Sequence, residues 1–182
     1  GASYEMQQQA GTQLDMKQIL EETGKVTGQI RASMGGNTVE IAKAVTQAKL
    51  LGTSLEAVAN AGRQMLDFES SINAEMEAEL MTGRQLNLDR ARAAALAGDQ
   101  ATVAEELAKN MGDFTEFSKM NVLQQDALAA AMGMSSDEMG DMLFKQQVMG
   151  RTAEELRAQG EDELAQKLEA KSAQDQMNAA ME

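Results

Sequence analysis

The chain has 182 residues, with 16 basic and 29 acidic side chains, and its formal charge is −13. It contains no His and no Cys, which excludes the usual catalytic triads, thiolate nucleophiles and zinc sites. The acidic balance disfavours strong nucleic-acid binding and docking on an anionic membrane. No apolar run reaches the ~20 residues that a membrane span needs.

Composition predicts an all-α fold. Ala, Leu, Met, Gln, Glu and Lys are good helix formers, whereas β-branched and aromatic residues are scarce. Much of the apolar 43% is Ala and Met, which bury little area or pack adaptably, so the core is expected to be thin. The prediction is an array or bundle of short amphipathic helices, or an oligomer that supplies the missing burial.

The N-terminal end is expected to contribute little to this fold. Gly1-Ala2-Ser3 resembles a cloning scar, so the chain is interpreted as an excised fragment. Residues 1–13 offer little to bury and are expected to be disordered or a frayed helix. A helical module is predicted over 14–150, followed by a charged C-terminal helix over 151–182.

Glycines mark the junctions between the predicted helices. Each is followed within three residues by a helix-capping Asn, Thr, Asp or Ser and then by a Glu that can complete a capping box. The five junctions lie at 36–40, 52–56, 112–116, 133–138 and 150–155. They predict helices over 14–34, 38–51, 54–81, 88–97, 100–111, 114–132, 136–149 and 152–180, with Gly-capped turns that make successive helices neighbours.

The longest predicted helix of the module, 54–81, carries a broken heptad row of apolar residues. This row is the candidate packing or self-association face, and it pairs in a bundle or a short coiled coil. Phe68 widens the row, and Glu69 within it favours the bundle. The row consists of Leu55, Val58, Met65, Ile72, Met76 and Leu80.

Three other segments are distinguished by their composition and residue spacing. The Ala-rich run 91–97 permits close helix approach, which places it within a bundle. Met residues between 111 and 149 occur at helical spacing, which favours core packing over an adaptable binding groove. The C-terminal helix, with Leu156, Leu164 and Leu168 and a candidate break at Gly160, is expected to be a solvent-exposed arm or an extended coiled-coil helix.

The acidic side chains do not predict an active site. Glu75, Glu77 and Glu79 are paired carboxylates, but a glycosidase needs a cleft that holds two carboxylates at a defined separation. Residues 137–141 lack the ligand spacing of an EF-hand and are typical of a first helical turn. We therefore expect no enzyme activity, no cofactor and no metal.

Several strings resemble segments of bacteriophage tail tape measure proteins. They lie at 44–52, 68–72, 82–92 and 117–135, and the resemblance covers approximately residues 37–145. It implies a structural role: setting tail length and filling the tail tube lumen during assembly. The implied locations are the virion tail lumen and, during assembly, the host cytoplasm.

The resemblance also implies partners, namely tail tube proteins and a tail assembly chaperone, beside self-association. The frequent glycine breaks depart from a continuous rod, so this piece is expected to be a locally folded module. The alternative is a non-catalytic helical interaction or scaffold module of a secretion or chaperone type.

Overall fold

The computed structural model describes residues 28–149, 153–158, 160 and 165–170. Within these residues the chain is all-α and forms a helical bundle without strands, as predicted. Residues 1–13, expected to be disordered or a frayed helix, and residues 14–27 of the predicted helix 14–34 lie outside the described residues. The helices are α3 (Gly28–Ser33), α4 (Thr38–Leu51), α5 (Leu55–Met65), α6 (Phe68–Thr82), α7 (Asp89–Ala97), α8 (Gln100–Met111), α9 (Phe114–Lys119), α10 (Val122–Ala131), α11 (Ser136–Val148) and α12 (Ala153–Ala158).

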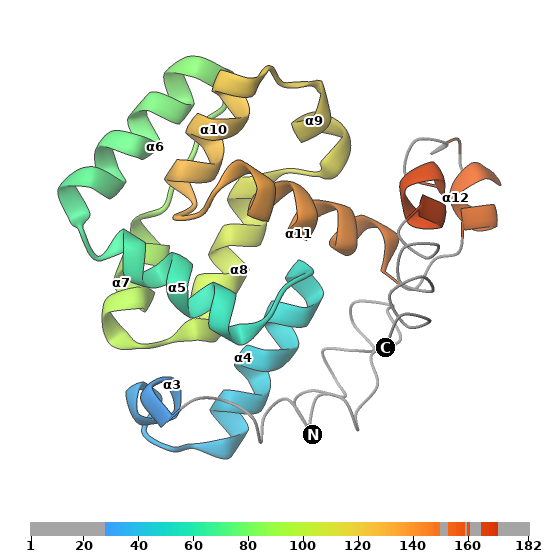
Figure 1. Ribbon diagram of the computed structural model, residues 1–182. Coiled ribbons are helices and arrows are strands. Elements are labelled where there is room, and N and C mark those ends of the chain that lie inside the picture. Colours follow the sequence, from blue (N-terminus) through green and yellow to red (C-terminus); the bar gives the residue numbers. More distant parts are fainter. Residues whose placement is uncertain (1–27, 150–152, 159, 161–164, 171–182) are drawn as a thin grey trace, which may run out of the picture.

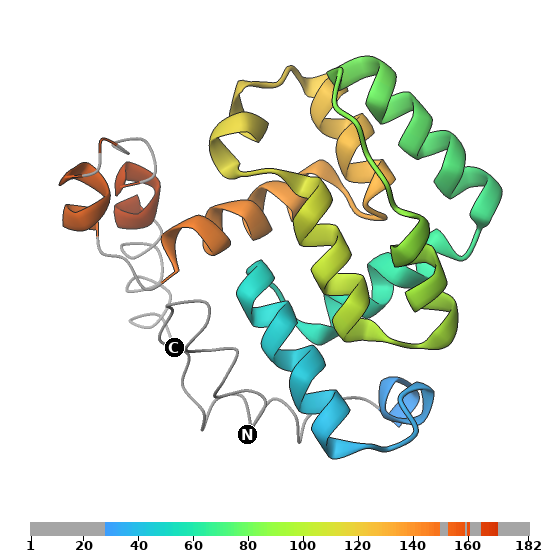
Figure 2. The ribbon, with the colours of Figure 1, turned by 180° about the vertical axis from the view of Figure 1, so that it is seen from behind.

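The bundle is organised around α8, which packs against α4, α5 and α7 (Figure 1). Helix α6 lies along an outer edge and packs mainly against α10. Seen from behind, the extended segment 83–88 runs from the end of α6 back to α7 (Figure 2). Helix α11 contacts α4, α9 and α10, and it extends toward α12.

Most of the buried apolar side chains form one cluster that reaches from α4 to α11. Methionines fill much of it, as their helical spacing predicted. Met65, Met111, Met132 and Met139 are essentially inaccessible to solvent. A second, smaller cluster joins α3, α4 and α5 around Ile41. Met is flexible and fills irregular gaps, which suits a bundle of many short helices.

The predicted capping residues begin four of the helices. Glycines with positive φ precede them, and in each case the side-chain oxygen accepts a bond from a backbone N–H of the first turn. The N-cap residues are Asn37, Ser54, Asp113 and Ser135. Of the capping boxes predicted at these four junctions, only Ser135 with Glu138 is formed, because Glu40 and Glu116 do not bond back to their caps and the cap of α5 is Ser54 and not Thr53. The fifth junction includes residues outside the described ranges.

The prediction of one helix over 54–81 was wrong. Helix α5 ends at Met65, and Asp67 caps a new helix by accepting a bond from Ser70 N at 3.4 Å. The predicted helix 114–132 is divided in the same way, because Asn121 and Gln124 form a reciprocal capping box at 2.8 and 3.0 Å. Neither break contains a glycine, so the glycine pattern did not reveal it.

The described part of the C-terminal segment is not simply a solvent-exposed arm. Gly160 has a φ of +80°, and residues 165–170 form a further helical stretch. Ala165 is fully buried in the main core, and Leu168 packs against that core. Lys167 Nζ lies 4.7 Å from the centre of the Phe114 ring, which is a cation–π contact. The predicted exposed arm is therefore wrong at Ala165, whereas Leu164 of the predicted leucine row lies outside the described residues.

An ion pair links α12 to this stretch. Arg157 Nη2 lies 2.6 Å from Glu169 Oε2. The hydrogen bond from the Arg157 guanidinium, and its positive charge, hold the pKa of the Glu169 carboxyl below its ordinary value.

Candidate protein-binding surface

Helix α6 turns small and polar side chains toward the rest of the molecule: Ala78 and Ser71 are its buried residues. Arg92 of α7 is 5% exposed, and its Nη1 donates to the Ser71 hydroxyl at 3.1 Å. Its Nη2 lies 3.4 Å from Glu75 and 2.7 Å from Asp89. A buried guanidinium requires such partners, because an unpaired charge away from water is costly. The inward side of α6 is therefore held by polar contacts.

The same side of α6 also fixes the segment 83–88. Glu75 Oε1 accepts a bond from Leu88 N at 2.6 Å, and Glu79 Oε2 accepts one from Leu86 N at 3.2 Å. These bonds satisfy backbone donors of a segment that has no helix or sheet of its own. Two of the three carboxylates singled out in the sequence are thus used structurally, while Glu77 is exposed.

Residues of α8 complete this arrangement. Asn110 pairs with both the backbone N–H and the carbonyl of Asn87. Arg84 donates to the carbonyls of Asn110 and Met111, and so satisfies the C-terminal end of α8. The segment between α6 and α7 is therefore bonded on both sides, and the orientation of α6 is held firmly.

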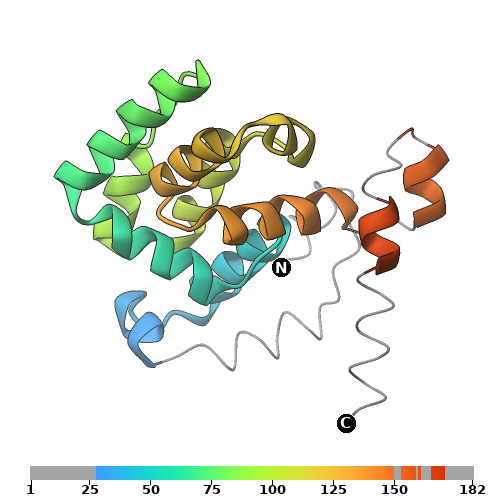
Figure 3. The same ribbon diagram turned by 45° about the horizontal axis from the view of Figure 1, so that its top comes forward.

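The exposed side of α6 carries a row of large apolar residues. Phe68, Ile72, Met76 and Leu80 follow one another at a spacing of four residues, so they form a continuous row along the helix. Their exposed fractions are 42%, 42%, 54% and 85%. Figure 3 shows α6 at the periphery of the bundle, where no described segment covers its outer side. We call these four residues the α6 row.

The end of the α6 row lies at the same end of the molecule as the first turn of α10. Gln124 Nε2 donates to the carbonyl of Met81 at 2.9 Å, which holds the two helices together there. Val122 and Leu123 in that turn are 69% and 66% exposed. Large apolar side chains therefore gather on two packed helices, which is typical of a surface that contacts another protein.

The structure divides the predicted packing or self-association face in two. Leu55, Val58 and Met65 lie on α5 and are buried in the core. Ile72, Met76 and Leu80 lie on α6 and are exposed. The break at residues 66–67 rotates the second half away from the first, so the six residues do not form one continuous face. Self-association through the exposed half stays a prediction.

Sequence reasoning missed the residue that orients α6. Arg92 stands among alanines, and nothing near it in the sequence shows that it is buried. A usable signal was present on α6, where the small or polar residues Ser71, Glu75 and Ala78 are spaced four and three apart and so share one side of the helix. Treating apolar residues as the inward side of every helix hid that signal.

Several hollows lie on the described surface. One hollow has a volume of about 450 Å³ and lies between the start of α6 and the turn before α11. Its one carboxylate, Glu138, is engaged with Ser135 in the capping box. Among the described residues there is no cluster of three acidic side chains placed to hold a metal ion. None of the helices described is long and apolar enough to cross a membrane.

Comparisons with protein-family models, with curated proteins and with solved structures found no match to this chain. The site is therefore interpreted from its own geometry. The α6 row, together with the polar contacts that orient α6, is the candidate protein-binding site of the described surface.

Proposed function

We propose that this chain is a non-catalytic helical module that binds another protein chain through the α6 row. The observation that carries the proposal is the inverted orientation of α6. Its buried side carries Ser71 and Ala78 and is joined to the rest of the molecule by bonds to Arg92 and segment 83–88, while four large apolar residues are exposed. Large apolar side chains gathered on one surface mark interaction sites.

The parent protein that we propose is a bacteriophage tail tape measure protein. Support comes from the short strings between residues 37 and 145, which resemble that family. In that role the module would contribute to tail length determination and tail assembly inside the tail tube lumen. Tail tube proteins, the assembly chaperone and further copies of the chain are then the candidate partners.

The folded bundle fits this proposal in one respect and limits it in another. A module with its own apolar core, as here, can fold locally within a long helical protein. The ten short helices of the described part do not form a continuous rod, so this piece would not measure length by its own extension. Its contribution would be a docking surface within the longer chain.

A scaffold of the secretion or chaperone type is the second candidate, because it would use the same row. The two are separated by genetic context, since a tape measure protein requires a very long reading frame beside tail tube genes. The decisive test is to co-express the full chain with the products of its neighbouring genes. A complex with a tube protein or tail chaperone should form and be lost in the Ile72→Ser/Met76→Ser variant.

The control for that test is Leu96→Ser on α7, where another large apolar residue is 68% exposed. This variant should keep the complex. A short reading frame away from tail genes would contradict the parent that we propose. A complex that survives both sets of substitutions would contradict the use of the α6 row.

A further inference from the structure

We infer that the partner of the α6 row is a basic amphipathic helix that is not part of these 182 residues. This inference rests on the proposed function of the row and specifies what binds there. Two observations carry it. One is the one-sided charge around the row, and the other is the lack of a complementary segment in the chain itself.

The charge around the row is entirely acidic along α6. Between Arg63 and Arg84 the sequence has no Lys or Arg, but it has five carboxylates. Glu75 and Glu79 are engaged inward, as described above. The other three, Asp67, Glu69 and Glu77, are exposed.

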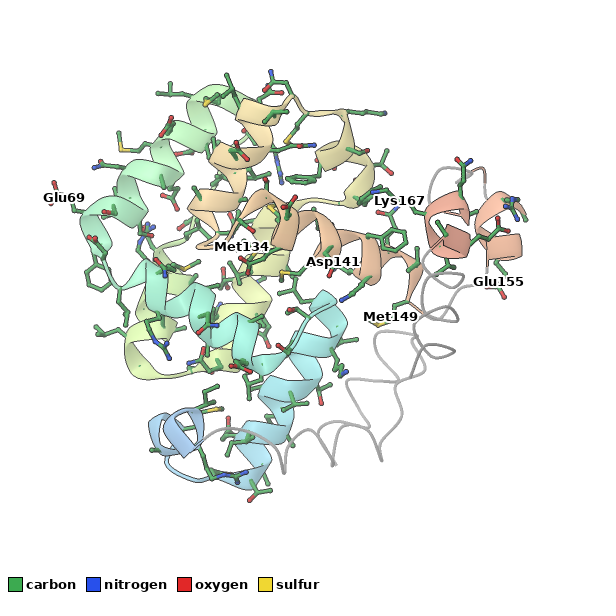
Figure 4. All side chains as sticks on the ribbon, in the orientation of Figure 1. Glu69, Met134, Asp141, Met149, Glu155 and Lys167 are labelled. Carbon is green, nitrogen blue, oxygen red and sulfur yellow. The ribbon has the colours of Figure 1, made fainter. Side chains whose placement is uncertain are left out.

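The exposed carboxylates stand beside the apolar residues and not on the far side of the helix. At about 100° per residue, Glu69 lies between Met76 and Leu80 around the helix axis, and Glu77 lies about 60° beyond Leu80. Figure 4 shows Glu69 pointing away from the molecule at one end of α6. A partner seated on the row would thus meet carboxylates along one rim.

A second copy of this chain is a poor match for that rim. Two α6 helices packed row to row would bring the carboxylates of both copies, including Glu69 and Glu77, into one interface. Like charges at an interface are unfavourable, and both chains already carry −13. The opposite charge is required, with Lys or Arg on either side of an apolar stripe.

The ends of the chain do not supply such a stripe either. Residues 1–27 contain two Lys and four acidic residues, and residues 171–182 contain one Lys and two acidic residues. The helical stretch 165–170 is already packed against Phe114 through Lys167. Because neither of these segments carries net positive charge, the complementary helix does not lie within them.

The row also fits a helix by shape. Side chains spaced four apart form a ridge that is inclined to the helix axis, and a second helix accepts such a ridge in its groove. Arg or Lys flanking that groove would reach Glu69 and Glu77 while their stems cover the apolar residues. Association should therefore depend on both the apolar row and the charged rim.

The test uses the full chain and two designed peptides of about 18 residues, which is long enough for a helix to form on contact. Both peptides carry Leu at every fourth position. One has Lys at the flanking positions and the other has Glu there. Binding is measured by fluorescence anisotropy of the labelled peptides, and the mass of the chain is followed by light scattering.

We expect the Lys peptide to bind at least about tenfold more tightly than its Glu twin, with affinity falling as salt rises. Glu69→Lys should weaken Lys-peptide binding by about fivefold or more. Glu155→Lys changes the charge equally on the opposite side of the molecule (Figure 4) and should leave binding within about twofold. Ile72→Ser/Met76→Ser should abolish binding, whereas Leu96→Ser should not.

The other outcomes separate this inference from the proposed function. If the Glu peptide binds equally well, or if the chain dimerises and the dimer is lost in Ile72→Ser/Met76→Ser, the α6 row binds proteins but the basic partner is overturned. If neither peptide binds and the chain stays monomeric, the inference is overturned. Loss of the gene-neighbour complex in the row variant would then still support the proposed function. Circular dichroism of each variant verifies that it is folded.

Discussion

Arg92 Nη2 lies 3.4 Å from Glu75 Oε2, and this ion pair joins α7 to the inward side of α6. The side chain of Arg92 is 6% exposed and that of Glu75 is 13% exposed, so both charges are largely removed from water. This relationship determines which side of α6 the protein hides and which side it presents.

The first prediction concerns this pair. Arg92→Leu should lower the free energy of unfolding by about 3 kcal/mol, because the Glu75 carboxylate would stay buried without its cation. Adding Glu75→Gln should recover part of the loss, since Gln is uncharged and can still accept a bond from Leu88 N. Urea denaturation measures both effects. An Arg92→Leu loss below about 0.5 kcal/mol would show that the pair does not hold α6.

The second prediction concerns the turn between α10 and α11. Gly133 has a φ of +76°, and a Cβ there would lie 2.5 Å from the carbonyl oxygen of Ala61 on α5. Gly133→Ala should therefore cost about 2–5 kcal/mol, from backbone strain and overpacking together.

The matched control is Gly83, whose φ is +74° but which has no atom within 4 Å of the added Cβ. Gly83→Ala should cost only about 1–2 kcal/mol from the left-handed backbone. Thermal and urea unfolding of the two variants give the comparison. Equal losses at the two positions would contradict the close approach of α5 to this turn.

The third prediction concerns the contact between Lys167 and the Phe114 ring. Lys167→Met keeps an apolar side chain of similar length and removes the charge. It should therefore weaken the packing of the helical stretch 165–170 against the core by about 0.5–1 kcal/mol. Hydrogen exchange of residues 165–170 should rise while that of α8 stays unchanged. Unchanged exchange in both regions would mean that Ala165 and Leu168 hold the stretch without the cation.

The fourth prediction concerns pH and the Arg157–Glu169 pair. The pKa of Glu169 is lowered from its ordinary value of 4.5, chiefly by the hydrogen bond from Arg157. Because the pKa is lower in the folded state, the pair stabilises the contact between α12 and the stretch 165–170 fully at pH values above the ordinary pKa. This stabilisation is lost as the pH falls through the lower, folded-state pKa. NMR titration of Glu169 measures this, and Arg157→Gln should return its pKa to the ordinary value. An ordinary pKa in the unsubstituted chain would contradict the pair.

The fifth prediction concerns DNA. With a charge of −13, the purified chain should bind duplex DNA with a Kd no tighter than about 10⁻⁴ M at physiological salt. A module inside a tail lumen would then not hold back the incoming genome. Fluorescence anisotropy across a salt series checks this. Tight binding that salt does not weaken would contradict both the charge argument and this part of the tape measure proposal.

Much of the fold could be predicted because helix formation and capping are local. Good helix formers, glycines with positive φ and capping side chains such as Asn37 and Ser135 act within a few residues, so their effects are visible in the sequence. The breaks at Asp67 and Asn121 were missed although they use the same chemistry. Neither is preceded by a glycine, and uninterrupted helix formers on both sides favoured one long helix in each case.

The sequence by itself determined the helical class, most helix boundaries, the acidic charge and the residues available for an interface. The tertiary structure decided which of those residues reach solvent. Apolar periodicity assigns the row of large residues on α6 to the core, but the side that is buried carries Ser71 and Ala78, with Glu75 and Glu79 bonded to Arg92 and to the backbone donors of segment 83–88. These partners lie far along the chain, and a buried charge or donor without a partner costs more than an exposed apolar side chain. Phe68, Ile72, Met76 and Leu80 therefore face outward.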